Sequence, residues 1–171
     1  MPGVFTLKLF YTMNSSATHP LDQVLASCRQ DDRPIGLVTG VFDLLHQGHL
    51  QFLNQASIKM RELGGCLIVG VESDVRVRKL KGKGRPIESQ EQRKSQMEAT
   101  RLADFVFILP EKFDAESDHL QLIKMIKPKI LLVSQHTPFL DRKKKLMQTV
   151  GGLVEVVCQR DPRFSTTKMI K

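Results

Sequence analysis

The sequence has few aromatic residues: one tyrosine, no tryptophan and nine phenylalanines among 171 residues. A protein that stacks single-stranded nucleic acid on aromatic side chains would here depend on phenylalanine or histidine. The formal net charge of +8 nevertheless indicates an anionic partner, either a nucleic acid or a phosphorylated small molecule. We favour the small molecule, because the basic residues cluster around the motifs described below. A nucleic-acid binder would show steeply salt-dependent binding to DNA or RNA, and salt-resistant, site-specific binding of RNA would overturn our ranking.

Cysteine is also scarce, and Cys28, Cys66 and Cys158 are isolated from one another. Their spacing fits neither a zinc site nor a disulfide framework. We expect Cys66 and Cys158 to be small apolar residues buried in strands. No apolar run is long enough to cross a membrane. The N-terminal segment lacks a clean signal peptide, because Lys8 interrupts its apolar run, so we expect a cytoplasmic protein without a membrane partner.

Short apolar runs rich in β-forming residues alternate with segments of helical periodicity. Strands are expected at residues 35–42, 66–72, 105–109, 129–134 and 153–158. Helices are expected at residues 20–28, 47–63, 88–103, 115–127 and about 138–149, and a basic loop at residues 73–87. This alternation predicts a Rossmann-like α/β fold, a doubly wound parallel five-stranded sheet with right-handed crossovers. The single domain is expected at residues 20–171, after a poorly ordered extension at residues 1–19.

Two histidines lie three residues apart, His46 and His49, where the first strand ends and a helix begins. Residues at this spacing share a helix face, and a helix start offers unpaired N–H groups and the positive end of the dipole to an anion. Gly48 and Gly40 let phosphate oxygens approach the backbone closely. Zinc bound by the histidines and Asp43 is a weaker hypothesis, because no fourth protein ligand is evident.

The surrounding stretch, TGVFDLLHQGHLQFL, resembles the first motif of the HxGH-type nucleotidylyltransferase superfamily, in which the histidines steady the phosphates of a nucleoside triphosphate. Residues 71–99 resemble the second segment of the heptose-phosphate adenylyltransferases, and QRDPRFSTTKMI, at residues 159–170, resembles the terminal motif that holds the triphosphate. Three motifs in family order are much more specific than HxGH alone. The resemblance covers about residues 21–171.

The resemblance implies nucleotidyl transfer: a phosphate oxygen of an acceptor attacks the α-phosphorus of the triphosphate, and pyrophosphate leaves. Catalysis of this kind depends mostly on positioning and electrostatic stabilisation. The implied catalytic residues are His46, His49, Lys81, Arg93 and Arg160. The implied nucleotide contacts are Thr39, Gly40, Val41, Phe42, Asp43, Gly48, Lys79, Ser165, Thr166 and Thr167. Mg²⁺ is expected to arrive with the nucleotide, held mainly by phosphate oxygens and water, so no protein metal site is predicted.

Other charges are interpreted as solvated. Lys83 and Arg85 are expected to be loop charges in solvent, and Lys143, Lys144 and Lys145 a solvated helix face. The clearest departure from the family is the segment SQHTPF, at residues 134–139, where relatives carry a Gly-Asp turn that contacts substrate or nucleotide. Because of this departure, the sequence does not identify the acceptor.

The first hypothesis is transfer of AMP from ATP to a sugar phosphate, of the D-glycero-D-manno-heptose 1-phosphate kind. One alternative is a CTP-dependent cytidylyltransferase that acts on a polyol or amino-alcohol phosphate such as glycerol 3-phosphate. Another is a non-catalytic nucleotide-binding relative, which would bind triphosphate without releasing pyrophosphate. Relatives commonly dimerise, so a homodimer fits the resemblance, and no nucleic-acid partner is expected.

Overall fold

The computed structural model describes residues 19–135 and 137–158. They contain a parallel sheet of five strands in the order β3-β2-β1-β4-β5, in which every neighbouring pair is parallel. The strands are β1 (Ile35–Gly40), β2 (Cys66–Val71), β3 (Phe105–Ile108), β4 (Ile130–Ser134) and β5 (Leu153–Cys158). The prediction of a doubly wound, five-stranded Rossmann-like sheet is confirmed.

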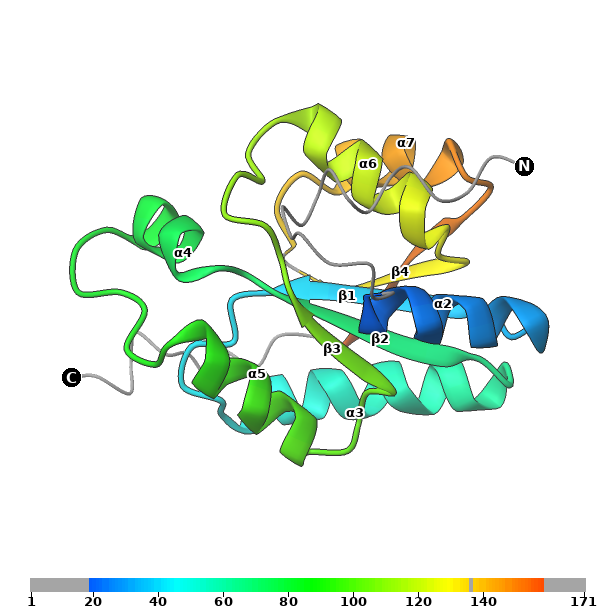
Figure 1. Cartoon of the computed structure of the whole chain (residues 1–171), viewed down its shortest axis with the longest axis horizontal. Helices are drawn as coiled ribbons and strands as arrows, with labels where there is room; N and C mark the ends of the chain where they lie inside the picture. Colours follow the sequence, from blue (N-terminus) through cyan, green and yellow to red (C-terminus); the bar gives the residue numbers. More distant parts are fainter. Residues whose placement is uncertain (1–18, 136, 159–171) are drawn as a thin grey trace.

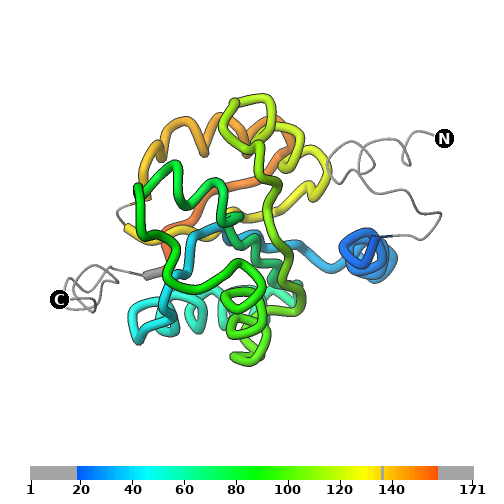
Figure 2. Tube along the Cα trace, turned by 60° about the vertical axis from the view of Figure 1, so that its left-hand side comes forward, coloured from blue at the N-terminus to red at the C-terminus, as the bar shows by residue number. Residues whose placement is uncertain are grey.

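Helices cover both faces of this sheet (Figure 1). They are α2 (Pro20–Gln30), α3 (Gln47–Glu62), α4 (Asp74–Lys81), α5 (Gln90–Ala99), α6 (Glu116–Ile126) and α7 (Leu140–Gln148). Side chains of α3 and α5 form one hydrophobic cluster with the sheet, and side chains of α2, α6 and α7 form the other. Figure 2 shows α2 end-on at one side of the molecule, on the opposite side from α4. No helix in these ranges is long and apolar enough to span a bilayer.

The central strands are buried on both faces, as their unbroken apolar sequences predict. Every residue of β2 is buried. On β1, Gly36 permits close approach of α3, because a Cβ there would lie 2.5 Å from the Met60 sulfur. The tight packing of α3 on β1 fixes where this helix starts, and its first turn carries the predicted anion site.

One expected loop contains a helix, so that prediction is wrong. Residues 74–81 form α4, whose N-cap Ser73 accepts a hydrogen bond from the Arg76 N–H at 3.3 Å. The helix ends at Gly82, whose φ of +86° suits glycine. Only Val77 of α4 is buried, so the segment lacks the apolar periodicity by which a helix is recognised.

The expectation of isolated cysteines is also wrong. Cys28 of α2 and Cys66 at the start of β2 form a disulfide across 38 residues of sequence. Both side chains are buried in the cluster beneath α2. Sequence spacing does not reveal such a pair, because their proximity depends on how α2 packs against the sheet. The bridge ties α2 to a central strand.

Candidate active site

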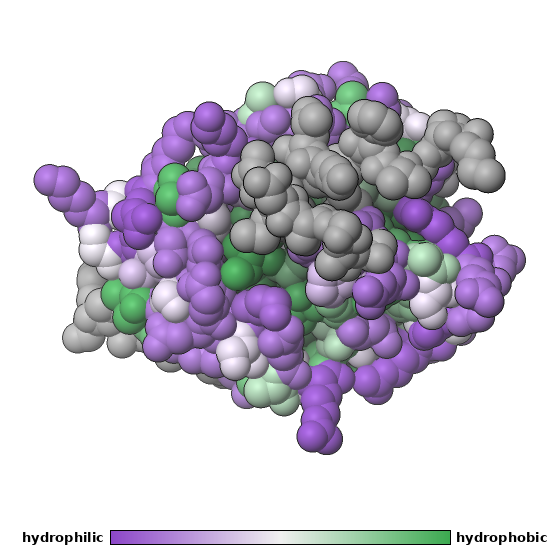
Figure 3. Space-filling view, in the orientation of Figure 1, coloured by the Kyte–Doolittle hydropathy of each residue, from purple (hydrophilic) through white to green (hydrophobic). Residues whose placement is uncertain are grey.

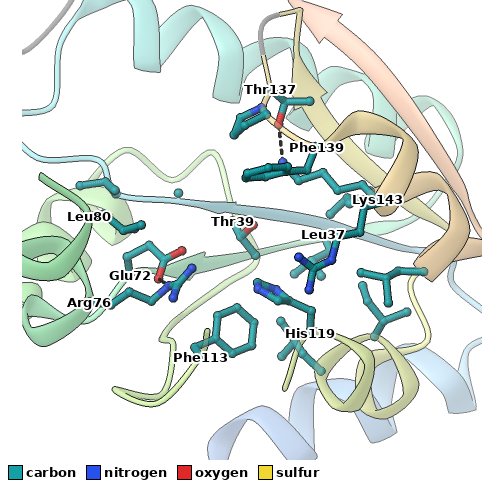
Figure 4. Close-up of a pocket in the computed structure, with 18 of the residues that line it drawn as sticks. Leu37, Thr39, Glu72, Arg76, Leu80, Phe113, His119, Thr137, Phe139 and Lys143 are labelled. Atoms are coloured by element: carbon teal, nitrogen blue, oxygen red, sulfur yellow. Dashed lines mark hydrogen bonds and ion pairs between the residues drawn. The ribbon is translucent and has the colours of Figure 1, made fainter. Parts of the chain in front are cut away.

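The candidate site lies at the carboxyl ends of β1 and β4, where the sheet order reverses. In open α/β sheets, ligands bind in the crevice outside this switch point. A cavity of about 620 Å³ opens here (Figure 4). Its walls come from the ends of β1, β2 and β4 and from α4, α6 and α7. Three residues predicted to contact the nucleotide, Thr39, Gly40 and Val41, line it.

His46 and His49 stand at the start of α3. His46 is the N-cap, and its Nδ1 accepts hydrogen bonds from the N–H groups of Gly48, at 3.1 Å, and His49, at 3.4 Å. An accepting Nδ1 carries no hydrogen, so Nε2 carries it and is the donor. The rings of His46 and His49 are stacked, with centroids 3.7 Å apart and planes inclined by 18°. We call His46 and His49 at the start of α3 the histidine corner. It presents two imidazoles on one face, beside a helix N-terminus.

The backbone just before α3 is unusual. Phe42 and Leu44 have φ values of +52° and +56°, in the left-handed region that non-glycine residues rarely adopt. The ring of Phe42 is buried and meets His49 edge-on, with centroids 5.4 Å apart. Gly40 leaves room for that ring, because a Cβ there would lie 2.9 Å from it. Backbone strain of this kind concentrates at functional sites.

Arg93 holds three segments of the site together. Ser89 and Gln92 form a capping box that fixes the start of α5 and brings Arg93 inward. The fully buried guanidinium donates to the Val41 carbonyl at 2.6 Å and to the Asp74 carboxylate at 2.6 Å. Its Nε donates to the Glu88 carbonyl, just before the N-cap of α5, at 3.0 Å. The structure gives Arg93 a positioning role, and its contact with the nucleotide stays a prediction.

Asp43 organises the loop that precedes α5. Its carboxylate accepts hydrogen bonds from the N–H groups of Ile87, at 3.0 Å, and Glu88, at 3.1 Å. Arg85 Nε lies 3.1 Å from the same carboxylate, with its side chain 13% exposed. The expectation that Arg85 is a solvated charge is therefore wrong, because a buried aspartate draws it inward. The contact of Asp43 with the nucleotide stays a prediction.

The basic side chains of α4 face a small acidic group. Arg76 Nε lies 2.9 Å from the Glu72 carboxylate. Arg76 and Lys79 both pair with Asp114, and the hydrogen bond from Lys79 is the main reason that the pKa of Asp114 is below its ordinary value. Burial raises the pKa of Glu72, although Arg76 opposes that rise. Lys81, at the end of α4, is exposed.

Several pocket residues escape sequence analysis: Arg76, Phe113, His119, Phe139, Arg142 and Lys143. They come from three helices and two loops, and no local pattern joins them. His119 packs against Phe113, with ring centroids 4.2 Å apart. Burial is the largest cause that lowers the pKa of His119, and Arg76 adds to it. Lys143 was expected in solvent but is half-buried, whereas Lys144 and Lys145 are exposed.

Four predicted site residues, Arg160, Ser165, Thr166 and Thr167, lie outside the described residues, so their roles stay predictions. Within the described ranges, no group of three or more His, Cys, Asp or Glu side chains is arranged to hold a metal ion. The surface seen in Figure 3 is mainly hydrophilic in its described part, with small hydrophobic spots. Among the exposed apolar residues are Leu80 of α4 and Phe139, which both line the pocket.

Comparison with known proteins gives a match to the cytidylyltransferase-like family over residues 37–171. The bifunctional proteins HldE of Campylobacter jejuni subsp. jejuni serotype O:6 and of Trichlorobacter lovleyi are each 36% identical to the chain over 152 residues, or 88% of the chain. The match spans only 30% and 29% of the length of these relatives. The chain therefore spans less than a third of the length of these relatives.

Solved structures give the same fold at lower identity. A lipopolysaccharide core biosynthesis protein from Thermoplasma volcanium GSS1 is 23% identical, with a TM-score of 0.55, and the match covers 75% of this chain and 96% of that one. A macrolide-efflux protein from Streptococcus pneumoniae is 17% identical, with a TM-score of 0.60 over 80% of this chain and 50% of that one. These likenesses show the fold alone.

Proposed function

The chain belongs to the cytidylyltransferase-like family, as its three motifs predict, and is a nucleotidyltransferase; on that premise we propose that it transfers AMP from ATP to a sugar phosphate of the heptose 1-phosphate kind and releases pyrophosphate. The observation that carries the proposal is the stacked pair His46 and His49 at the start of α3. A helix N-terminus with two imidazoles beside it suits a polyphosphate.

In this proposal the two histidines donate hydrogen bonds to the triphosphate and to the pyrophosphate as it leaves. In His46 the donor is Nε2, because Nδ1 accepts the N–H groups of the helix cap. Lys81, exposed at the end of α4, brings positive charge to the α-phosphate. Arg160, Ser165, Thr166 and Thr167 complete the triphosphate site by resemblance. The transition state is then stabilised mainly by positioned charge and hydrogen-bond donors.

Mg²⁺ enters this proposal with the nucleotide. The described residues offer no three-ligand cluster, and the Asp43 carboxylate is already bonded to Arg85 and to two backbone N–H groups. Such a site suits an ion held mainly by phosphate oxygens and water, as is common for magnesium in phosphoryl-transfer enzymes. The ion would supply charge neutralisation on the phosphates.

We place the acceptor in the cavity between α4, α6 and α7. Its volume of about 620 Å³ lies within the usual range of small-molecule sites, about 300–1,000 Å³. Thr39, Gly40 and Val41 line the cavity and lead directly into the histidine corner. An acceptor phosphate at this end of the cavity would approach the α-phosphorus of a nucleotide bound at the start of α3.

ATP is favoured over CTP because residues 71–99 resemble the heptose-phosphate adenylyltransferases. The first test is thermal unfolding with Mg²⁺ and each of ATP, CTP, GTP and UTP. A ligand at about 100 times its dissociation constant stabilises the native state by about 2.7 kcal/mol. A selective shift with ATP supports the proposal, and a selective shift with CTP supports the cytidylyltransferase alternative.

Turnover is tested by pyrophosphate release from the preferred triphosphate with a panel of sugar and polyol phosphates. Binding without release for any acceptor would favour the non-catalytic alternative. Because the substrates are phosphorylated metabolites and ATP, we place the enzyme in the cytoplasm. Size-exclusion chromatography with light scattering would decide whether the chain forms the homodimer that its resemblance implies.

A further inference from the structure

The acceptor cavity has two distinct ends. It follows β1 from Val41 and Gly40, at the histidine corner, back to Leu37. Three residues of a strand, from Gly40 to Leu37, extend about 10 Å. In Figure 4, Lys143 and His119 lie beside Leu37, whereas Leu80 of α4 lies on the other side of Thr39. A ligand whose reacting phosphate sits at the corner would reach the Lys143 end with its opposite terminus.

The charges near α4 are balanced. The Arg76 guanidinium contacts the carboxylates of Glu72, at 2.9 Å, and Asp114. Lys79 shares Asp114. The positive charge of α4 beside the cavity is thus already compensated by protein carboxylates.

The charges at the α6–α7 end are not balanced in the same way. The Lys143 ammonium donates a hydrogen bond to the Thr137 hydroxyl, and no ion pair joins it to a carboxylate in the described part of the chain. The Arg142 Nε is buried and has no hydrogen-bond acceptor among the described residues. It lies 3.5 Å from Glu116, whose side chain is 68% exposed. Two cations therefore line the cavity, and among the described residues the one ion pair that either of them makes is with the exposed Glu116.

The titration behaviour agrees with this geometry. Burial is the larger influence and lowers the pKa of Lys143, and Glu72, which lines the same cavity, opposes that only partly. The pKa of His119 is lowered by burial first and then by Arg76, Arg142 and Lys143, with Asp118 opposing. Partly buried charges without a counter-charge are unfavourable in a folded protein, so they often mark ligand sites.

We propose that the acceptor carries a second anionic group, a carboxylate or a phosphate, at the end opposite its reacting phosphate, and that Lys143 and Arg142 bind this group beside His119. The inference deepens the proposed function and rests on it for the identity of the acceptor. Within the sugar phosphates of the proposed function, it favours those with negative charge at both ends, such as a sugar acid 1-phosphate or a sugar bisphosphate, over a heptose 1-phosphate whose far end is neutral.

The departure from the family pattern after β4 fits the same assignment. The segment SQHTPF contains no carboxylate, whereas the Gly-Asp turn that it replaces contains one. A carboxylate there would repel a second anion and accept hydrogen bonds from neutral hydroxyl groups. In this chain the turn instead places Thr137 where its hydroxyl orients the Lys143 ammonium. The change therefore favours an anionic group over a hydroxyl at this end of the acceptor.

The test is a binding measurement by isothermal titration calorimetry on the full chain without nucleotide, so it does not depend on turnover. Three probe comparisons are matched in skeleton: glucose 1-phosphate with glucuronic acid 1-phosphate, glucose 1-phosphate with glucose 1,6-bisphosphate, and glycerol 3-phosphate with 3-phosphoglycerate. At least one doubly anionic probe should bind about tenfold or more tightly than its singly anionic match. The carboxylate and phosphate probes distinguish the two forms of the second anion.

Lys143→Met should remove that preference, and Lys144→Met is the matched control on the same helix, because Lys144 is exposed and does not line the cavity. Equal affinity for both members of every pair would overturn the inference, as would a preference that survives Lys143→Met. If the preference holds but no triphosphate releases pyrophosphate with any probe, the anion subsite stands and the proposed transfer reaction is what fails.

Discussion

The imidazole rings of His46 and His49 stack at 3.7 Å, while Nδ1 of His46 caps the helix that carries His49. His46 thus has a structural contact at one nitrogen and a donor at the other. His46→Ala should lower stability by about 1 kcal/mol through loss of the cap. His46→Asn keeps a capping acceptor and removes the imidazole, so it should fold normally and lose about 100-fold or more in kcat.

The measurement is pyrophosphate release beside urea denaturation for both variants. His49→Ala should behave like His46→Asn, because the Nδ1 acceptor of the helix cap belongs to His46. If His46→Asn retained full activity, the pair would be structural only.

Arg93 should be one of the most sensitive positions for stability. Arg93→Met would leave the Asp74 carboxylate and the Val41 carbonyl without their donor, and breaking a buried pair in this way costs about 3 kcal/mol or more. Lys94→Met is the control, because the Lys94–Glu98 pair is partly exposed and should contribute about 0.5 kcal/mol or less. Urea denaturation compares the two. Similar losses for both variants would contradict the positioning role of Arg93.

The disulfide between Cys28 and Cys66 should stabilise the oxidised protein. It closes a 38-residue loop, for which chain entropy gives about 4 kcal/mol. Thermal unfolding with and without dithiothreitol should therefore show a clear difference in midpoint, and Cys28→Ala should abolish that difference. A thiol titration of the unfolded, unreduced protein in which all three cysteines react would contradict the bridge.

His119 should make stability depend on pH on the acidic side. Burial and neighbouring cations lower its pKa in the fold below the ordinary 6.5. The unfolded chain then binds the proton more readily, so stability is lost as the pH falls through 6.5 toward the lowered value. Melting midpoints measured between pH 8 and pH 5 should fall more steeply for the native sequence than for His119→Gln. Parallel curves would show that His119 does not contribute.

Phe139 combines an unfavourable backbone with an exposed ring. Its φ is +57° at the N-cap of α7, and its side chain is 75% exposed. Asparagine tolerates this conformation and caps helices well, so Phe139→Asn should stabilise the protein by about 1 kcal/mol. The ring lines the cavity in which we place the acceptor, so the same variant should raise the KM for the acceptor. A variant both less stable and fully active would refute this account.

Sequence patterns predict the sheet and its helices well, because each strand is a short apolar run and each long helix has an apolar stripe. They miss α4, where Val77 alone is buried, and they miss the Cys28–Cys66 contact, which only the tertiary packing creates. The family is also predictable, because its motifs are contiguous. The lining of the acceptor cavity is not: Lys143 has the same sequence context as Lys144, and only the direction of each side chain separates a pocket residue from a solvated one.

The sheet divides the chemistry of this enzyme between its two faces. The helices α3 and α5, which carry the histidine corner and Arg93, pack on one face, and α6 and α7, which carry His119 and Lys143, pack on the other. If the proposed sites are correct, mutations in α6 and α7 should alter acceptor choice and leave the triphosphate site at the start of α3 intact. In such a scaffold the range of acceptors would change through substitutions in α6 and α7, while α3 and α5 on the other face stay the same. Exchange of the segment from β3 to α7 between relatives would be the natural engineering route to new nucleotide-activated products.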